Sequence, residues 1–154
     1  MATYSADYVA ERSQGLNGKM NFIERTIDFK QVAAYRAGAG LTALGSGDVY
    51  EILELPAKTL VLRVGYDVTT AEGATATVHI GDGATASGFV SGANLNSVGS
   101  GASALALTEG APNTITGYSG GKYYSAADTI DLTLNHASID AAVVRVWALI
   151  VECA

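Results

Sequence analysis

A histidine, a carboxylate and a hydroxyl lie close together in the stretch TVHIGDGATASGF, at residues 77–89. They are His79, Asp82 and Ser87, the side-chain types of a hydrolase triad, in which an acid orients the histidine and the histidine activates the serine. The GDG turn could also hold a metal ion or a phosphate. The alternative is a strand, a turn and a second strand, with an aspartate in the turn because its carboxylate bonds nearby backbone amides.

The sequence favours the turn over a catalytic site. The spacing brings these three side chains close together but supplies neither an oxyanion hole nor a nucleophile elbow. We therefore expect that the protein is not an enzyme. His79 and His136 are the only histidines and Cys153 is the only cysteine, which leaves too few ligands for a zinc site. Asp128 and Asp131 leave calcium as a weaker alternative. The stretch lacks the GK[ST] ending of a phosphate loop, and we expect no metal and no cofactor.

A second group of residues suggests sugar binding. Tyr118, Tyr123 and Tyr124 lie near Gly120 and Gly121, and aromatic rings on the surface of a sandwich can stack on sugars. The same rings could instead fill the core or a subunit interface, where aromatic side chains are favoured. Both interpretations stay open at the level of the sequence.

Composition and charge limit the possible partners. Hydrophobic residues make up 49% of the 154 residues and charged residues 16%, with 18 glycines and a net charge of −6. Low charge and many glycines are typical of a β-rich protein with many turns and subunit contacts. The chain has no cluster of lysine and arginine for phosphate contacts, so we expect no direct binding to nucleic acid. It has no apolar run long enough for a membrane helix and no signal-peptide pattern, so we expect no membrane partner.

Alternation of apolar and polar residues predicts the elements that must position these side chains. Strands are expected at residues 48–56, 59–70, 75–80, 129–136 and 141–152, with shorter ones at 87–90 and 103–108. In the third of these, Ala76, Val78 and Ile80 should face the core and His79 should face away. Residues 141–152 are apolar on both faces, which indicates a central strand. Residues 30–37 could form two turns of helix. The fold class is therefore all-β, an antiparallel β-sandwich resembling a jelly roll.

The chain divides into an irregular N-terminal arm at residues 1–25 and a β-sandwich domain at residues 26–154. The arm shows no sustained period, and we expect it to gain order on contact with a partner. Residues 91–121 form the least regular part of the domain, and a loop region of this length usually has a function such as binding.

Several stretches together are similar to a known group of proteins. The two most specific are VTTAEGATATVHIGDG, at residues 68–83, and KYYSAADTIDLTL, at residues 122–134. With NFIERTIDFKQVAAYRAGAG and the final strand, they resemble small structural proteins of tailed bacteriophages over residues 21–152. This resemblance implies a capsid decoration (cement) protein that forms homotrimers and binds the major capsid protein on the outer surface of the phage head, after synthesis in the host cytoplasm. It offers no catalytic motif.

The alternative function is a glycan- or receptor-binding module of a phage tail or head fibre. In either case the contacts are expected in the arm, the long loops and the aromatic residues. The candidate interaction residues are Tyr4, Tyr8, Arg12, Phe22, Tyr118, Tyr123 and Tyr124.

Overall fold

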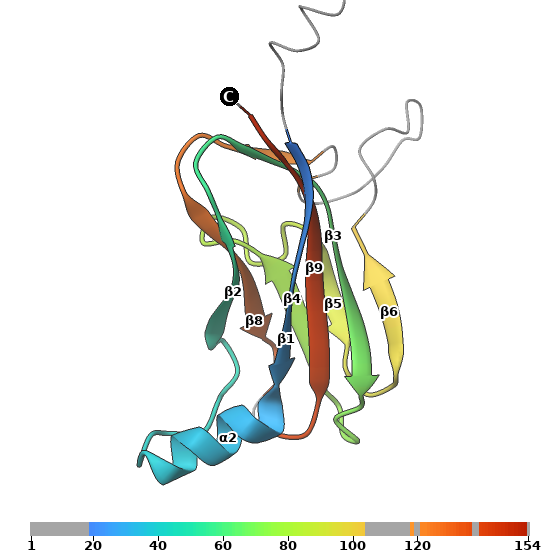
Figure 1. The fold of residues 1–154 in the computed structure, drawn as a ribbon. Helices are drawn as coiled ribbons and strands as arrows, with labels where there is room; N and C mark the ends of the chain where they lie inside the picture. The colour runs from blue at the N-terminus through green and yellow to red at the C-terminus, as the bar shows by residue number, and fades with distance from the viewer. Residues whose placement is uncertain (1–18, 104–117, 119–120, 137–138, 154) are drawn as a thin grey trace, which may run out of the picture.

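The computed structural model describes residues 19–103, 118, 121–136 and 139–153. These residues form nine strands and one helix (Figure 1). The elements are β1 (Lys19–Asp28), α2 (Phe29–Gly38), β2 (Val49–Leu55), β3 (Thr59–Thr70), β4 (Thr77–Gly81), β5 (Val90–Asn94), β6 (Gly99–Ala102), β7 (Lys122–Tyr124), β8 (Asp128–Leu134) and β9 (Val143–Glu152).

Two antiparallel sheets make up a β-sandwich, which confirms the all-β prediction. One sheet has the order β1-β9-β3-β6, with β7 paired to β3, and the other has the order β2-β8-β4-β5. Apart from β7, each early strand pairs with a late one in a nested series: β1 with β9, β2 with β8, β3 with β6 and β4 with β5. This nesting is the strand order of a jelly roll, and Figure 1 shows the two sheets as two layers.

The core lies between the sheets and follows the predicted alternation. Ala76, Val78 and Ile80 are buried at β4, as expected. In β9 every second residue from Val144 to Ile150 is at most 1% exposed. β9 is central because β1 and β3 pair with its two edges. The predicted strands at 48–56, 59–70 and 129–136 are confirmed as β2, β3 and β8.

The helix follows directly from the end of β1. The Asp28 side chain accepts hydrogen bonds from the backbone N–H groups of Lys30 and Gln31, which caps the first turn. Phe29 is completely buried and fixes this turn against the sandwich. The helical expectation for residues 30–37 is therefore confirmed. No helix in the described parts of the chain is long and apolar enough to span a membrane.

Three expectations from the sequence need correction. Residues 19–25, assigned to the N-terminal arm, form the first part of β1 and pair with β9, while residues 1–18 lie outside the described residues. The irregular region 91–121 contains most of β5 and the whole of β6. The strand expected at 103–108 remains a prediction, because it lies almost entirely outside the described residues.

The third correction concerns which faces of β3 are buried. The sequence places Leu60 and Val64 on one face and Val61 on the other. The register against β9 shifts between Val61 and Arg63, as at a β-bulge. As a result Val61 and Val64 both face the core and are fully buried, whereas Leu60 remains partly exposed on the outer face.

One glycine makes room for an indole ring on the outer face of this sheet. Gly65 pairs with Trp147 across β3 and β9, and a Cβ atom at Gly65 would lie 2.2 Å from Cζ2 of Trp147. The indole therefore occupies the space above Gly65. On its other side it stacks with Phe22 of β1, with 5.6 Å between ring centroids and 25° between planes.

We predict that Gly65→Ala destabilises the protein by about 2 kcal/mol, because overpacking forces the indole away from the sheet. Gly99→Ala is the matched control, since a Cβ atom at this strand glycine meets nothing within 4 Å. Urea unfolding followed by Trp147 fluorescence measures both variants. An equal effect of the two substitutions would contradict this account of Gly65.

Candidate functional site

The structure does not assemble a catalytic triad from the stretch at residues 77–89. Nδ1 of His79 accepts a hydrogen bond from the N–H of Gly92 at 3.0 Å, so the ring ties β4 to β5. Among these described residues no hydrogen bond joins His79, Asp82 and Ser87. Asp82 instead forms the centre of a different arrangement, which the sequence indicated only in part.

The turn after β4 is organised by the Asp82 carboxylate. Its Oδ1 accepts hydrogen bonds from the backbone N–H groups of Ala84, at 3.0 Å, and Thr85, at 2.9 Å. The predicted role of Asp82, bonding nearby amides in a turn, is thus confirmed. Asp82 is nevertheless only 3% exposed, and a buried carboxylate needs more partners than two amides.

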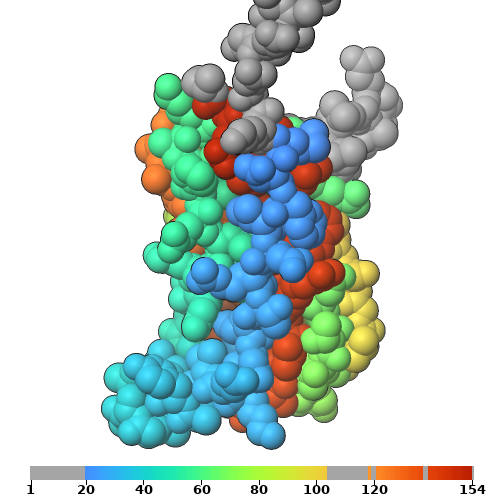
Figure 2. All heavy atoms as spheres, viewed as in Figure 1, coloured from blue at the N-terminus to red at the C-terminus, as the bar shows by residue number. Residues whose placement is uncertain are grey.

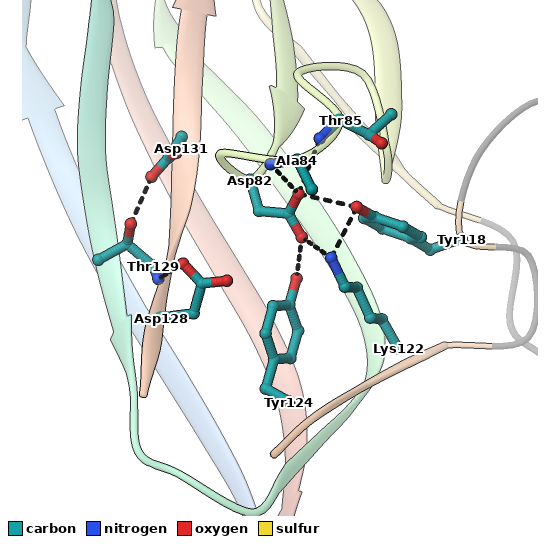
Figure 3. Close-up of polar contacts among 9 residues, drawn as sticks. All are labelled: Asp82, Ala84, Thr85, Tyr118, Lys122, Tyr124, Asp128, Thr129 and Asp131. Carbon is teal, nitrogen blue, oxygen red and sulfur yellow. Dashed lines mark hydrogen bonds and ion pairs between the residues drawn. The ribbon is translucent and has the colours of Figure 1, made fainter. Parts of the chain in front are cut away.

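Three side chains from distant parts of the sequence supply these partners (Figure 3). The Tyr118 hydroxyl donates to Oδ1 at 2.7 Å, and the Tyr124 hydroxyl donates to Oδ2 at 2.6 Å. The Lys122 ammonium forms an ion pair with Oδ2 and also donates to the Tyr118 hydroxyl at 2.7 Å. We call Asp82, Tyr118, Lys122 and Tyr124 the Asp82 cluster.

Aromatic rings surround the ammonium group of this cluster. Nζ of Lys122 lies 4.1 Å from the ring centroid of Tyr118 and 4.7 Å from that of Tyr124. Phe89 packs edge-on against Tyr118, with 5.1 Å between centroids. The rings attract the cation through their faces. The Asp82 side chain is fully enclosed, whereas that of Lys122 is 23% exposed, so only the carboxylate end of the ion pair lies in an environment of low polarity.

The pKa values of the cluster reflect this environment. Burial by itself would raise the pKa of Asp82, but hydrogen bonds from Lys122, Tyr124 and Tyr118 outweigh it and lower the pKa to about 2. Burial would lower the pKa of Lys122, but its hydrogen bonds to Asp82 and Tyr118 raise it. Burial and the bond to Asp82 both raise the pKa of Tyr124. The cluster therefore holds one carboxylate and one ammonium across the neutral range, which suits a structural ion pair.

The cluster connects the two sheets. Asp82 follows β4 of one sheet, whereas Lys122 and Tyr124 belong to β7, which pairs with β3 of the other. Alternation along β7 turns Lys122 and Tyr124 inward and Tyr123 outward, and Tyr123 is 52% exposed. Tyr118 and Tyr124 are thus used in the interior, which leaves Tyr123 as the exposed member of the three tyrosines considered for sugar stacking.

A second carboxylate, Asp131 of β8, is also buried. The alternation of residues 129–136 predicts a polar face for Asp131, but Asp131 is 5% exposed and accepts a hydrogen bond from the Thr129 hydroxyl at 2.7 Å. Burial raises the pKa of Asp131. In the described residues no group of three or more histidine, cysteine or acidic side chains is arranged to hold a metal ion.

The candidate interaction residues fall in different places. Tyr4, Tyr8 and Arg12 lie outside the described residues. Phe22 is 56% exposed on the outer face of the β1-β9-β3-β6 sheet, and Tyr123 lies on the same face. They belong to a group of apolar side chains that we call the apolar platform: Met20, Phe22, Leu60, Tyr123, Trp147, Leu149 and Val151.

A groove of about 470 Å³ lies where the two sheets approach each other at β1 and β2. Arg25, Tyr50 and Glu51 line it, together with the first turn of α2. Asp28 also lines it, but its carboxylate caps the helix. The groove brings together a cation, an anion and a phenol.

Comparison with solved structures relates this geometry to known proteins. A chain of the capsid of Ralstonia phage GP4 has a TM-score of 0.57 and 11% identity, covering 88% of this chain and 86% of that chain. This chain folds like chains of three phage capsids. A chain of the cyanophage Pam1 capsid asymmetric unit has a TM-score of 0.53 and 15% identity, covering 100% and 93% of the two chains.

The third is a chain of the acidic stable capsid structure of Helicobacter pylori bacteriophage KHP30, with a TM-score of 0.54, 12% identity and 86% coverage of both chains. Coverage is similar on both sides of each comparison, so the matched chains are about as long as this one. Identity at this level establishes a shared fold alone. No protein-family model matches the sequence, and no curated protein matches it.

We predict that Asp82→Asn destabilises the protein by about 3 kcal/mol at pH 7, because it leaves the Lys122 ammonium without its buried partner. Asp67→Asn is the matched control. Asp67, like Asp82, forms an ion pair, in this case with Arg145 at 2.7 Å on the partly exposed outer face. An exposed pair of this kind contributes at most about 1 kcal/mol. Urea unfolding compares the two, and equal losses would contradict a special role for Asp82.

The cluster also predicts a pH dependence. The pKa of Asp82 falls from 3.8, its ordinary value, to about 2 in the folded protein, so its stabilising contribution is present above pH 3.8 and is lost as the pH falls through 2. The stability difference between the natural protein and Asp82→Asn should therefore shrink by about 2 kcal/mol between pH 6 and pH 2. Asp131 changes stability in the opposite direction, since its raised pKa relieves its burial cost in acid, but it is present in both proteins. A difference independent of pH would contradict the prediction.

Proposed function

We propose that this chain is a capsid decoration protein of a tailed bacteriophage, a homotrimer that binds the major capsid protein on the outer surface of the head. The observation that carries the proposal is the jelly-roll fold, shared over most of the chain with chains of similar length in three phage capsids. The sequence resemblance to small structural proteins of tailed phages supports the same role. The proposed role is structural, without catalysis or a cofactor.

Such a protein acts through binding equilibrium. A subunit that binds the assembled lattice better than free capsid subunits shifts the equilibrium toward the shell. The gain depends on presenting the binding surfaces in a fixed arrangement, because ordering them on contact would cost affinity. The buried Asp82 cluster and the nested strand pairs supply this rigidity.

The segment between residues 103 and 118 is a candidate for lattice contacts, and the sandwich holds both of its ends. Ser103 accepts a hydrogen bond from the N–H of Val64 through Oγ, at 3.0 Å, and donates its own N–H to the Val64 carbonyl at 2.7 Å. The Tyr118 N–H donates to the Gly88 carbonyl at 2.7 Å. Any contact made by residues 104–117 therefore starts from two fixed points.

We expect the protein to bind phage heads that were assembled without it. Purified protein mixed with undecorated heads of the phage that encodes it should sediment with the heads to a saturating stoichiometry. Cryo-electron microscopy of those heads should then show jelly-roll density on the outer surface. Density confined to the tail, or no binding to heads, would contradict the proposal.

A truncation tests the proposed role of the N-terminal arm. Because β1 starts at Lys19, deletion of residues 1–18 leaves the described sandwich intact. We expect the truncated protein to unfold at an unchanged temperature but to occupy fewer sites on the heads at equal concentration. Full occupancy by the truncated protein would show that the arm makes no lattice contact.

A further inference from the structure

The strand registers bring the seven residues of the apolar platform onto one face of one sheet. Tyr123 of β7 pairs with Leu60 of β3, which pairs with Val151 of β9, which pairs with Met20 of β1. Directly paired residues of adjacent strands point to the same face of a sheet. Four strands thus contribute one continuous apolar row across the sheet.

The next rows continue the platform along the strands. Leu149 pairs with Phe22, and Trp147 lies over Gly65 and stacks on the Phe22 ring. The alternate residues of β9 are those buried in the core, so these side chains take no part in the sandwich interior. In Figure 2, β1, β9, β3 and β6 lie side by side on the face turned to the viewer, and no described element covers them.

The platform ends at a row of charges that are paired with one another. Arg145 donates to Asp67 at 2.7 Å and to Glu24 at 3.2 Å. This row crosses β3, β9 and β1 on the same face. One charged side chain, Arg63, points to the same face, because it pairs with Leu149 in the row of Phe22, and its Nε donates to the Ser103 carbonyl at 3.1 Å. The seven platform residues themselves carry no charge, so another apolar surface can cover them while the guanidinium keeps that hydrogen bond.

The size of the platform argues that it is covered in the working protein. Met20, Phe22 and Tyr123 are 64%, 56% and 52% exposed, and together they present on the order of 350 Å² of apolar surface. The largest continuous apolar patch on a typical soluble monomer is about 300–600 Å², and a patch of this size often binds a partner. The four partly buried members extend it toward the roughly 800 Å² that each partner contributes to a standard interface.

We infer that the apolar platform is the surface through which copies of this chain bind one another. The platform, with Arg63 beside it, combines aromatic residues, methionine and arginine, which are the types enriched at protein interfaces, and the cores of homodimer interfaces are the most apolar of these. β1 pairs only with β9 among the described residues, so its other backbone edge is open beside Met20 and Phe22. A second copy over these two side chains also shields that edge from uncontrolled strand pairing. The inference rests on the proposed function for the number of copies, three, but not for the surface.

The double variant Met20→Ser/Phe22→Ser tests this surface in the full-length protein. Both side chains are more than half exposed on an edge strand, so the fold should tolerate the change. The matched control is Tyr35→Ser/Val98→Ser, which removes two apolar side chains that are 74% and 68% exposed away from the platform. Native mass spectrometry at micromolar concentration should show trimers for the natural protein and the control, and monomers for the platform variant.

We expect the platform variant to require a concentration at least ~100-fold higher for half-association, the combined loss of two central interface side chains. Trp147, the only tryptophan, reports on the same surface, and its emission should shift to longer wavelength when the natural oligomer is diluted. Tyr123→Ser, on a different strand, should weaken association as well, and circular dichroism verifies that each variant is folded.

Two results would overturn the inference: a natural protein that stays monomeric up to about 100 μM, or a platform variant that associates as strongly as the control. Binding to undecorated heads is measured separately. A platform-dependent oligomer that never binds heads would overturn the proposed function and leave the platform as a self-association surface. A monomer that decorates heads would overturn both the platform inference and the proposed homotrimer, and would leave the decoration role standing.

Discussion

A carboxylate enclosed in the sandwich must find enough donors to replace the water it has lost, and Asp82 meets this constraint with five. Two come from its own turn, and three come from a segment 36 to 42 residues later. These donors hold three pieces of backbone in place. The two amides belong to the turn after β4, Tyr118 directly follows residues 104–117, and Lys122 and Tyr124 belong to β7. An unpaired buried charge costs several kcal/mol, so these pieces are held in one arrangement.

The same constraint reaches the outer surface through β7. This strand has three residues, and its alternation is fixed because Lys122 and Tyr124 both bind Asp82 from the inside. Tyr123, between them, therefore faces outward, where it continues the row of Leu60, Val151 and Met20. A buried ion pair in one sheet's turn therefore determines the edge of an apolar surface on the other sheet.

Sequence reasoning succeeded where the relevant interactions are local. The period of two in β4 and β8 reports which residues face the core, and the preference of aspartate for turns predicts the bonds to Ala84 and Thr85. It failed for the long-range donors because spacing along the chain carries no information on which tyrosines approach Asp82. The stretch KYYS does carry one signal for these donors. Lys122 and Tyr124 are two residues apart, so in a strand they face the same side and could form a polar inner face.

The remaining misses have physical causes of the same kind. The bulge in β3 reverses the faces of Leu60 and Val61, and nothing in an alternating strand marks the residue at which the register against β9 will shift. β1 was divided because its first residues are polar or exposed and show no inner face by themselves, although β9 holds all ten in register. The apolar outer residues of β9 predict a central strand. That prediction is correct for the position of β9 in the sheet, but the outward-facing residues of β9 form part of a surface and not of the core.

Most of the residues that specify the fold differ from those of the proposed binding surface. The inner residues of a jelly roll need only be apolar and of suitable volume, which is how chains with 11–15% identity can share this architecture. The outer face of the β1-β9-β3-β6 sheet has no such requirement, since water would accept polar side chains there at no cost. An aromatic stack over Gly65 and an uncharged row across four strands are not needed for folding. The proposed self-association of the platform accounts for them, because a fold alone does not define a function, which depends on surface sites of this kind.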